Sequence, residues 1–191
     1  LENISGTVIA RNSLDGLKDY VLVPSFEEIA RDKDAFNTAF KTIYSESDPI
    51  SGKAIVQKCG DKFFVQYPPA PPLTTEEMDS IYALPYMRNW HSAYDKAGGV
   101  PGFETVRNSV TSHRGCAGGC NFCSLYLHQG RIIQSRSVKS IVSEIALIAG
   151  DQKFRGTITD IGGPSATMYM ALCPSWKEAV ACRDTRWSVP E

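Results

Sequence analysis

The sequence feature that most constrains this chain is a group of three cysteines within eight residues. Cys116, Cys120 and Cys123 follow the spacing Cys-x-x-x-Cys-x-x-Cys, with glycines at positions 115, 118 and 119 that keep the loop supple. Three thiolates can bind three corners of a cubic 4Fe-4S cluster and leave the fourth iron open, whereas electron-transfer clusters normally have four cysteine ligands. An open iron can chelate the amino and carboxylate groups of S-adenosylmethionine (SAM) and set the sulfonium beside a one-electron donor. The spacing therefore indicates a site for radical chemistry.

Other interpretations of the same cysteines stay open. Structural zinc sites usually use two Cys-x-x-Cys pairs or a histidine as the last ligand, and His113 and His128 are close enough in sequence to supply one. Unligated thiols are a third alternative. A disulfide framework is disfavoured, because six cysteines in 191 residues are sparse and no secretory signal is visible.

Two further features are candidates for binding SAM. Phe122 directly precedes the last cysteine, where an aromatic side chain is typical of SAM-binding loops and can face the adenine ring; the alternative is a core aromatic residue that anchors the loop. Gly162 and Gly163 precede Pro164. Glycines let a ligand approach the backbone, whose carbonyls can accept hydrogen bonds from an ammonium group. By itself this glycine pair is only a turn signal.

The sequence around the cysteines predicts a parallel βαβ unit. Ser137 is a candidate N-cap for a helix that ends near Gly150, and its apolar residues recur at helical spacing: Val138, Ile141, Val142, Ile145 and Ile148. Strands are expected at Thr105 to Thr111 and at Gly156 to Ile161. Cys116 then lies just beyond the carboxyl end of a strand, which is where parallel α/β structures bind ligands.

Four stretches of the chain resemble a known family. They are Pro72-Leu-Thr-Thr-Glu-Glu-Met-Asp-Ser-Ile-Tyr-Ala-Leu-Pro-Tyr86, Arg114-Gly-Cys-Ala-Gly-Gly-Cys-Asn-Phe-Cys-Ser124, His128-Gln-Gly-Arg-Ile-Ile-Gln-Ser-Arg-Ser137 and Asp160-Ile-Gly-Gly-Pro-Ser-Ala-Thr-Met-Tyr169. Together they are similar to the YgiQ family of radical SAM proteins. The resemblance implies a radical SAM (β/α) barrel whose cluster ligands correspond to Cys116, Cys120 and Cys123. It also implies SAM recognition at Gly162 and Gly163. Many radical SAM enzymes have an acidic residue where this chain has Pro164.

The resemblance also implies an activity. It is the reductive cleavage of SAM to a 5′-deoxyadenosyl radical, which then abstracts hydrogen from a substrate that the resemblance does not identify. A one-electron reductant such as flavodoxin or ferredoxin is the expected partner. The competing class is a non-catalytic zinc-binding interaction module, and metal content separates the two.

Chain length predicts that only part of such a barrel is present. The residues after Cys116 leave room for about two β/α units, which cannot close a barrel. We therefore expect an α/β fold in which residues 1–104 form an α+β N-terminal extension and residues 105–191 form the start of a radical SAM barrel. This expectation makes the chain a fragment.

Composition excludes some classes of function. The chain is 42% hydrophobic and 21% charged, with a formal net charge of −1. It has no basic excess for nucleic acid and no apolar run that could span a bilayer. A reducing cytoplasm suits thiolate ligands and an oxygen-sensitive cluster.

The N-terminal half carries local signals rather than catalytic ones. Ser25 and Glu28 form a capping box for a helix expected to end near Ser45, with one apolar face predicted to be core: Phe26, Ile29, Phe36, Phe40 and Ile43. Lys53 to Gln57 and Lys62 to Tyr67 predict a hairpin. A second capping box, Thr74 and Glu77, predicts a short helix through about Tyr82.

Several other side chains have ordinary roles as their first interpretation. Arg131 and Arg136 can pair with the SAM carboxylate, but structural salt bridges are favoured. His128 is expected to be structural. Cys59 is expected to be a turn thiol, and Cys173 and Cys182 are expected to be free cysteines, because two thiols do not make a metal site.

Overall fold

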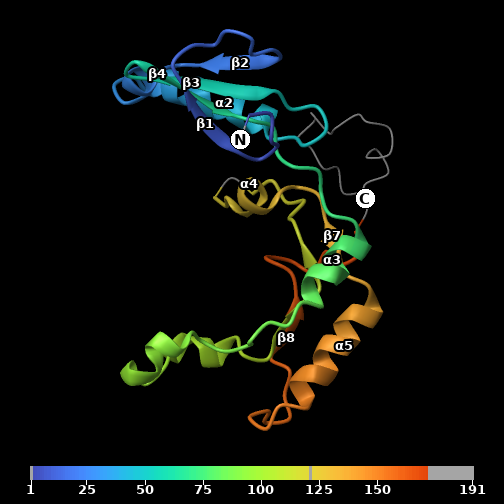
Figure 1. The fold of residues 1–191 in the computed structure, drawn as a ribbon. Helices are drawn as coiled ribbons and strands as arrows, with labels where there is room; N and C mark the ends of the chain where they lie inside the picture. The colour runs from blue at the N-terminus through green and yellow to red at the C-terminus, as the bar shows by residue number, and fades with distance from the viewer. Residues whose placement is uncertain (1, 121, 172–191) are drawn as a thin grey trace. The chain divides into compact units, whose positions relative to one another are not determined.

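The computed structural model describes residues 2–120 and 122–171. Within them the chain forms two compact units, one ending at Pro72 and one running from Leu73 to Ala171 (Figure 1). Cys173 and Cys182 lie outside the described residues. The sequence predicted a different boundary, between an N-terminal extension at residues 1–104 and the start of a barrel at residues 105–191. That boundary stays a prediction.

The first unit is a four-stranded sheet with two helices. Its elements are β1 (Val8–Arg11), β2 (Tyr20–Val23), α1 (Phe26–Ile29), α2 (Lys33–Glu46), β3 (Ala54–Cys59) and β4 (Lys62–Gln66). The strand order is β1-β4-β3-β2, with β2 parallel to β3 and the other neighbours antiparallel. Cys59 pairs with Lys62, so the predicted hairpin is confirmed. The turn needs Gly60, which has φ +59°.

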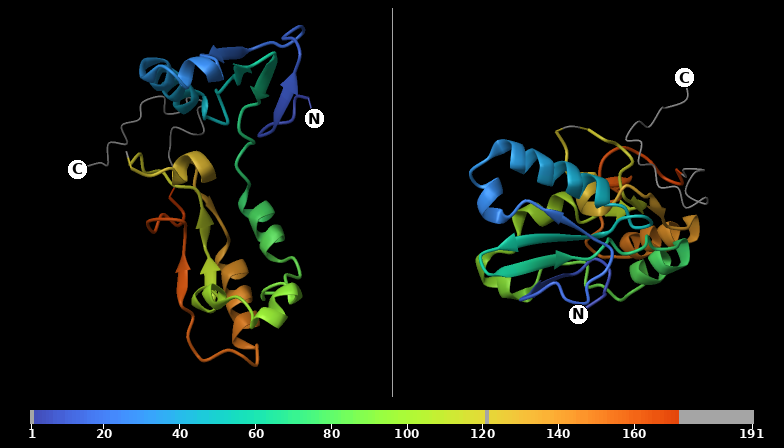
Figure 2. Two further views of the ribbon diagram at one scale, coloured as in Figure 1. Left: turned by 90° about the vertical axis from the view of Figure 1, so that its left-hand side faces the viewer. Right: turned by 90° about the horizontal axis from the view of Figure 1, so that it is seen from above.

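The long helix predicted after Ser25 is wrong, although its capping box is confirmed. The helix stops at Ile29, and Asp32 caps a new one by accepting the Asp34 N–H at 2.8 Å. Because the two helices have different axes, the apolar residues predicted to form one core face do not lie on a common face. Ile29 and Ile43 pack on the sheet, where α2 covers one face (Figure 2). The three aromatic residues are half exposed instead: Phe26 (53%), Phe36 (53%) and Phe40 (49%).

The second unit holds the cysteines. Its elements are α3 (Thr75–Tyr82), the 3₁₀-helices η1 (Ser92–Ala97) and η2 (Pro101–Thr105), β5 (Ser109–Thr111), β6 (His113–Arg114), α4 (Leu125–Gln129), β7 (Gln134–Ser135), α5 (Val138–Ala149) and β8 (Asp160–Gly162). β5 and β8 are parallel neighbours on either side of α5 in the chain. The predicted parallel βαβ arrangement is therefore confirmed.

Both predicted strands are too long at their amino ends. Pro101 begins η2, which occupies the chain through Thr105, so β5 starts only at Ser109. Gly156 has φ +84°, which turns the chain instead of extending it, and β8 starts only at Asp160. The strands that remain have Thr111 opposite Gly162 at their carboxyl ends.

The core of this unit lies between β5 and α5. Val110 packs against Ile141 and Ile148, and Ser137 caps α5 as predicted by accepting the Ser140 N–H. Val138 and Val142 belonged to the predicted apolar face but are 65% and 56% exposed. The apolar face of α5 is thus narrower than its sequence periodicity suggests.

The fold in residues 2–120 and 122–171 is mixed α/β, with open sheets only. The predicted barrel is not seen in this part of the chain. No described helix is long and apolar enough to cross a bilayer.

Candidate cluster-binding site

The three cysteines lie in a loop whose two ends are hydrogen bonded together. β6 and β7 form a two-residue antiparallel ladder that pairs His113 with Ser135 and Arg114 with Gln134. Just inside the ladder the Cys116 N–H donates to the Gly130 carbonyl at 3.0 Å. We call the segment between the strands, residues 115–133, the cysteine loop. It follows β5 and β6 directly, so it begins beyond the carboxyl end of a parallel strand, as predicted.

Gly115 is required at the start of the cysteine loop. Its φ is +92°, and a Cβ there would lie 2.1 Å from the Ile132 carbonyl oxygen. Backbone from the returning arm of the loop fills that space, so no side chain fits. The close approach fixes the direction in which Cys116 leaves the ladder.

The cysteines differ in exposure. Cys116 is buried, Cys123 is half-buried and Cys120 is exposed. A Cβ added to Gly118 would lie 3.5 Å from Cys116 Sγ and 3.6 Å from Cys120 Sγ, so these two sulfurs flank one point of the loop. In the part of the chain that the structure describes, no three His, Cys, Asp or Glu side chains gather closely enough to hold a metal ion. The ligand role of the three cysteines stays a prediction.

The segment after β8 reaches the cysteine loop. Cys116 Sγ lies 3.1 Å from Ser165 Oγ, which brings the first cysteine and the glycine motif together. The Gly162 carbonyl accepts the Ser112 N–H at 2.8 Å, and a carbonyl oxygen has the capacity to accept a second hydrogen bond. The cysteine loop and the glycine pair, both proposed from the sequence to bind SAM, therefore lie at the same edge of the unit, at the carboxyl ends of β5 and β8.

His113 explains why residue 163 is glycine. Its ring is fully buried, and a Cβ at Gly163 would lie 2.1 Å from His113 Nε2. His113 Nε2 accepts the Met168 N–H at 3.3 Å, so the proton is on Nδ1, which donates to Ser112 Oγ at 2.9 Å. Both ring nitrogens are thus occupied, which argues against His113 as a zinc ligand. This packing role of His113 was not predicted from the sequence.

The other predicted side chains in the cysteine loop are placed as follows. Phe122 is 92% exposed, so it does not anchor the loop in a core. His128 is exposed on α4. The guanidinium carbon of Arg131 lies 4.8 Å from the ring centre of Tyr126, a buried residue of α4. Arg131 therefore holds α4 against the returning arm of the loop.

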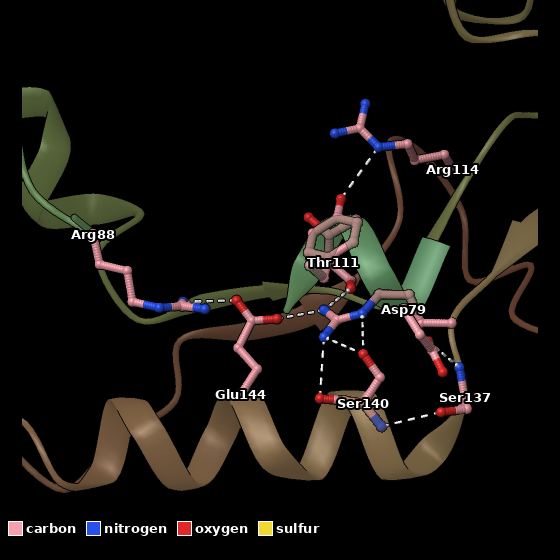
Figure 3. A network of polar contacts seen from close by, with 9 residues as sticks. Asp79, Arg88, Thr111, Arg114, Ser137, Ser140 and Glu144 are labelled. Atoms are coloured by element: carbon pink, nitrogen blue, oxygen red, sulfur yellow. Dashed lines mark hydrogen bonds and ion pairs between the residues drawn. The ribbon is translucent and has the colours of Figure 1, made fainter. Parts of the chain in front are cut away.

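Arg136 is structural, as favoured from sequence. It is fully buried and forms an ion pair with Glu144, which also pairs with Arg88 at 2.7 Å. Its guanidinium donates further to the Thr111 carbonyl at 2.8 Å and to Ser140 Oγ at 2.9 Å. Figure 3 shows this network between α5 and the end of β5. The Ser140 carbonyl and a second contact to Ser140 Oγ, each at 3.1 Å, take the remaining two N–H groups. All five donors of Arg136 are thus engaged, and none is left for a SAM carboxylate.

Helix α3 contacts both strands that close the cysteine loop. The ring centre of Tyr82 lies 4.1 Å from the Arg136 guanidinium carbon, and the Tyr82 hydroxyl accepts from Arg114 Nε at 3.2 Å. At the other end of the helix the Leu73 N–H donates to Gln134 Oε1 at 2.8 Å. Arg114 belongs to β6 and Gln134 to β7. The predicted helix at residues 74–82 was placed in an N-terminal extension, and its contacts with β6 and β7 were not predicted.

Asp79 connects α3 to the start of α5. Its carboxylate accepts the Ser137 N–H at 2.9 Å. Burial raises the pKa of Asp79, but the hydrogen bonds from Ser137 and Ser140 outweigh this effect, so the pKa lies below its ordinary value of 3.8. The ionised carboxylate is the form that the helix start stabilises.

Fold and site together define a class: a mixed α/β protein with a three-cysteine loop beyond the carboxyl end of a parallel strand. The family described as Radical SAM N-terminal matches residues 1–109, more than half of the chain. The chain belongs to this Radical SAM N-terminal family. The matched residues end before the cysteine loop.

The whole chain, loop included, is similar to proteins named UPF0313. It is 43% identical to a UPF0313 protein of Clostridium botulinum and 47% identical to one of Methanocella arvoryzae, over 191 residues in both cases. These alignments cover 100% of this chain and 30% and 32% of the relatives. A UPF0313 protein of Fusobacterium nucleatum is 46% identical over 91% of this chain and 31% of the relative. The chain thus spans about a third of its relatives' length. No solved structure matches it.

Proposed function

We propose that this chain carries the cluster-binding and SAM-binding part of a radical SAM enzyme of the YgiQ type. The observation that carries the proposal is the 3.1 Å contact between Cys116 Sγ and Ser165 Oγ. It joins the three-cysteine loop to the glycine motif at the carboxyl ends of two parallel strands, the edge where α/β proteins bind ligands. Membership of the Radical SAM N-terminal family supports the same proposal.

The residues present fit a 4Fe-4S cluster by the chemistry of their donors. Cys116, Cys120 and Cys123 supply three soft thiolates, the ligand type that such clusters use. Gly118 leaves the space between two of these sulfurs free of side chain. His113, the buried histidine beside the loop, has both nitrogens engaged, which makes a three-cysteine, one-histidine zinc site a poorer fit.

When bound, the cluster would supply the electron that cleaves SAM to methionine and a 5′-deoxyadenosyl radical. This chain's residues would bind and orient. The carbonyls around Gly162 and Gly163 would accept the SAM ammonium group, and the exposed Phe122 ring would cover the adenine. A barrel in the whole protein, a flavodoxin or ferredoxin as reductant, and a cytoplasmic location belong to the proposal. The substrate is unassigned.

Metal analysis tests the proposal. The chain is purified without oxygen, and its iron, acid-labile sulfide and zinc are measured. We expect brown protein with about four irons per chain. Colourless protein with one zinc would instead identify a zinc-binding interaction module and overturn the enzyme proposal.

A further inference from the structure

We infer that the Ser165 hydroxyl donates a hydrogen bond to the sulfur of Cys116 and thereby raises the reduction potential of the bound cluster. The inference rests on the proposed function, because Cys116 must be a cluster ligand. It gives Ser165, which follows the glycine motif, a role that is separate from SAM recognition.

The direction of the hydrogen bond follows from the chemistry of the ligand. In the free thiol either atom of the Cys116 and Ser165 pair can donate across the 3.1 Å contact. A sulfur bound to iron has lost its proton, so the serine hydroxyl is then the only donor of the two.

Cys116 and the segment that carries Ser165 are each held in place by further contacts, besides the one between the two side chains. Cys116 is 6% exposed, and its N–H is bonded to the Gly130 carbonyl. On the other side, Pro164 restricts the backbone before Ser165. The Met168 N–H is bonded to His113, and the Met170 N–H donates to Ser135 Oγ at 2.9 Å. The hydroxyl is therefore presented to the sulfur by a segment fixed at several points.

The contact is specific to one cysteine. Among residues 2–120 and 122–171, the sulfurs of Cys120 and Cys123 have no comparable side-chain hydrogen bond. Ser165 would thus act on a single corner of the cluster.

A hydrogen bond to a ligand sulfur favours the reduced cluster. The added electron increases negative charge on the sulfur atoms, and a donor stabilises that charge more than it stabilises the oxidised form. Removing the donor makes reduction harder. Outer-shell partners of this kind commonly tune metal sites.

The test compares variants of the whole chain at position 165. Ser165→Ala removes the donor. Ser165→Thr keeps a hydroxyl, and Ser165→Val has the shape of threonine without it. Thr167→Ala removes an exposed hydroxyl from the same segment and is the matched control. Each protein is reconstituted anaerobically, iron and sulfide are counted, and the midpoint potential is measured by titration with dithionite and mediators, followed by visible absorbance and electron paramagnetic resonance.

We expect the Ala and Val variants to keep their iron and shift to a more negative midpoint potential, while the Thr variant and the Thr167→Ala control stay at the wild-type value. An unchanged potential in Ser165→Ala, or an equal shift in the control, would overturn the inference alone. Loss of iron from both Ala and Val variants would make Ser165 a structural residue and overturn it too. A wild-type chain without iron would overturn the proposed function, and this inference with it.

Discussion

The ring of His113 occupies the space that any side chain at residue 163 would need, with Nε2 only 2.1 Å from the position of a Cβ on Gly163. His113 lies in β6 and Gly163 directly follows β8, so their contact holds the glycine motif against the base of the cysteine loop. The glycine is therefore required by packing, whatever ligand the motif binds.

Gly163→Ala is expected to destabilise the chain by about 1–3 kcal/mol, the usual cost of overpacking a buried site. Gly162→Ala is the control, because the atoms nearest to its Cβ would be the carboxylate oxygens of exposed Asp160, at 3.2 Å, which can move aside. Urea unfolding followed by circular dichroism measures both. Adding Gly163→Ala to His113→Ala should cost nothing further; a full additional loss would contradict the assigned clash.

Glu144→Ala is expected to cost about 3–5 kcal/mol, because it leaves the buried guanidinium of Arg136 without its carboxylate. The ion pair of Arg107 and Glu104 offers a contrast, because the Glu104 side chain is 59% exposed while the Glu144 side chain is only 8% exposed. Glu104→Ala should change the free energy of unfolding only slightly. Equal effects of the two substitutions in urea unfolding would contradict a buried structural role for Glu144.

Stability should fall in acid partly through Asp79. Its pKa is lowered in the folded chain, so its contribution is fully present above its ordinary pKa and is lost as the pH falls through the lower folded value. Asp79→Asn should reduce stability at pH 7 and flatten the decline that begins as the pH falls below about 5. Glu76→Gln, on an exposed residue of the same helix, is the control. An unchanged pH profile for Asp79→Asn would rule out this linkage.

Single replacement of Cys116, Cys120 or Cys123 by Ala should abolish cluster binding, because each is proposed to hold one iron and none is spare. Cys59→Ala should leave iron content and the visible spectrum unchanged, since Cys59 lies at the β3–β4 turn of the other unit. An unaltered iron spectrum after Cys120→Ala would count directly against the ligand assignment.

Local signals in the sequence predicted local structure well. The capping boxes that begin at Ser25 and Thr74 and the N-cap Ser137 all start helices, because each depends on residues within one turn. The break before Lys33 was missed although Asp32 is a recognisable N-cap. The apolar residues keep a helical spacing across residues 30–32, and this periodicity favoured one continuous helix over a new start at Asp32.

Contacts between distant residues could not be predicted in the same way. A two-residue ladder such as β6–β7 is too short to leave an alternating pattern. The contact of His113 with Gly163 and the stacking of Tyr82 on Arg136 each join residues about 50 positions apart. The cysteine spacing, in contrast, is local, so the candidate ligands were identifiable from the sequence. The residues that pack around the cysteine loop were not.

The ladder between β6 and β7 has a consequence for how a cluster would assemble. Because His113 and Ser135 already pair at the base of the cysteine loop, the chain entropy that ligand binding must overcome is that of a short closed segment. Cluster insertion would then involve this closed segment and leave the strands beneath it intact. Assembly on this chain would be a local event that follows folding, in contrast to small zinc domains, whose folding depends on the metal.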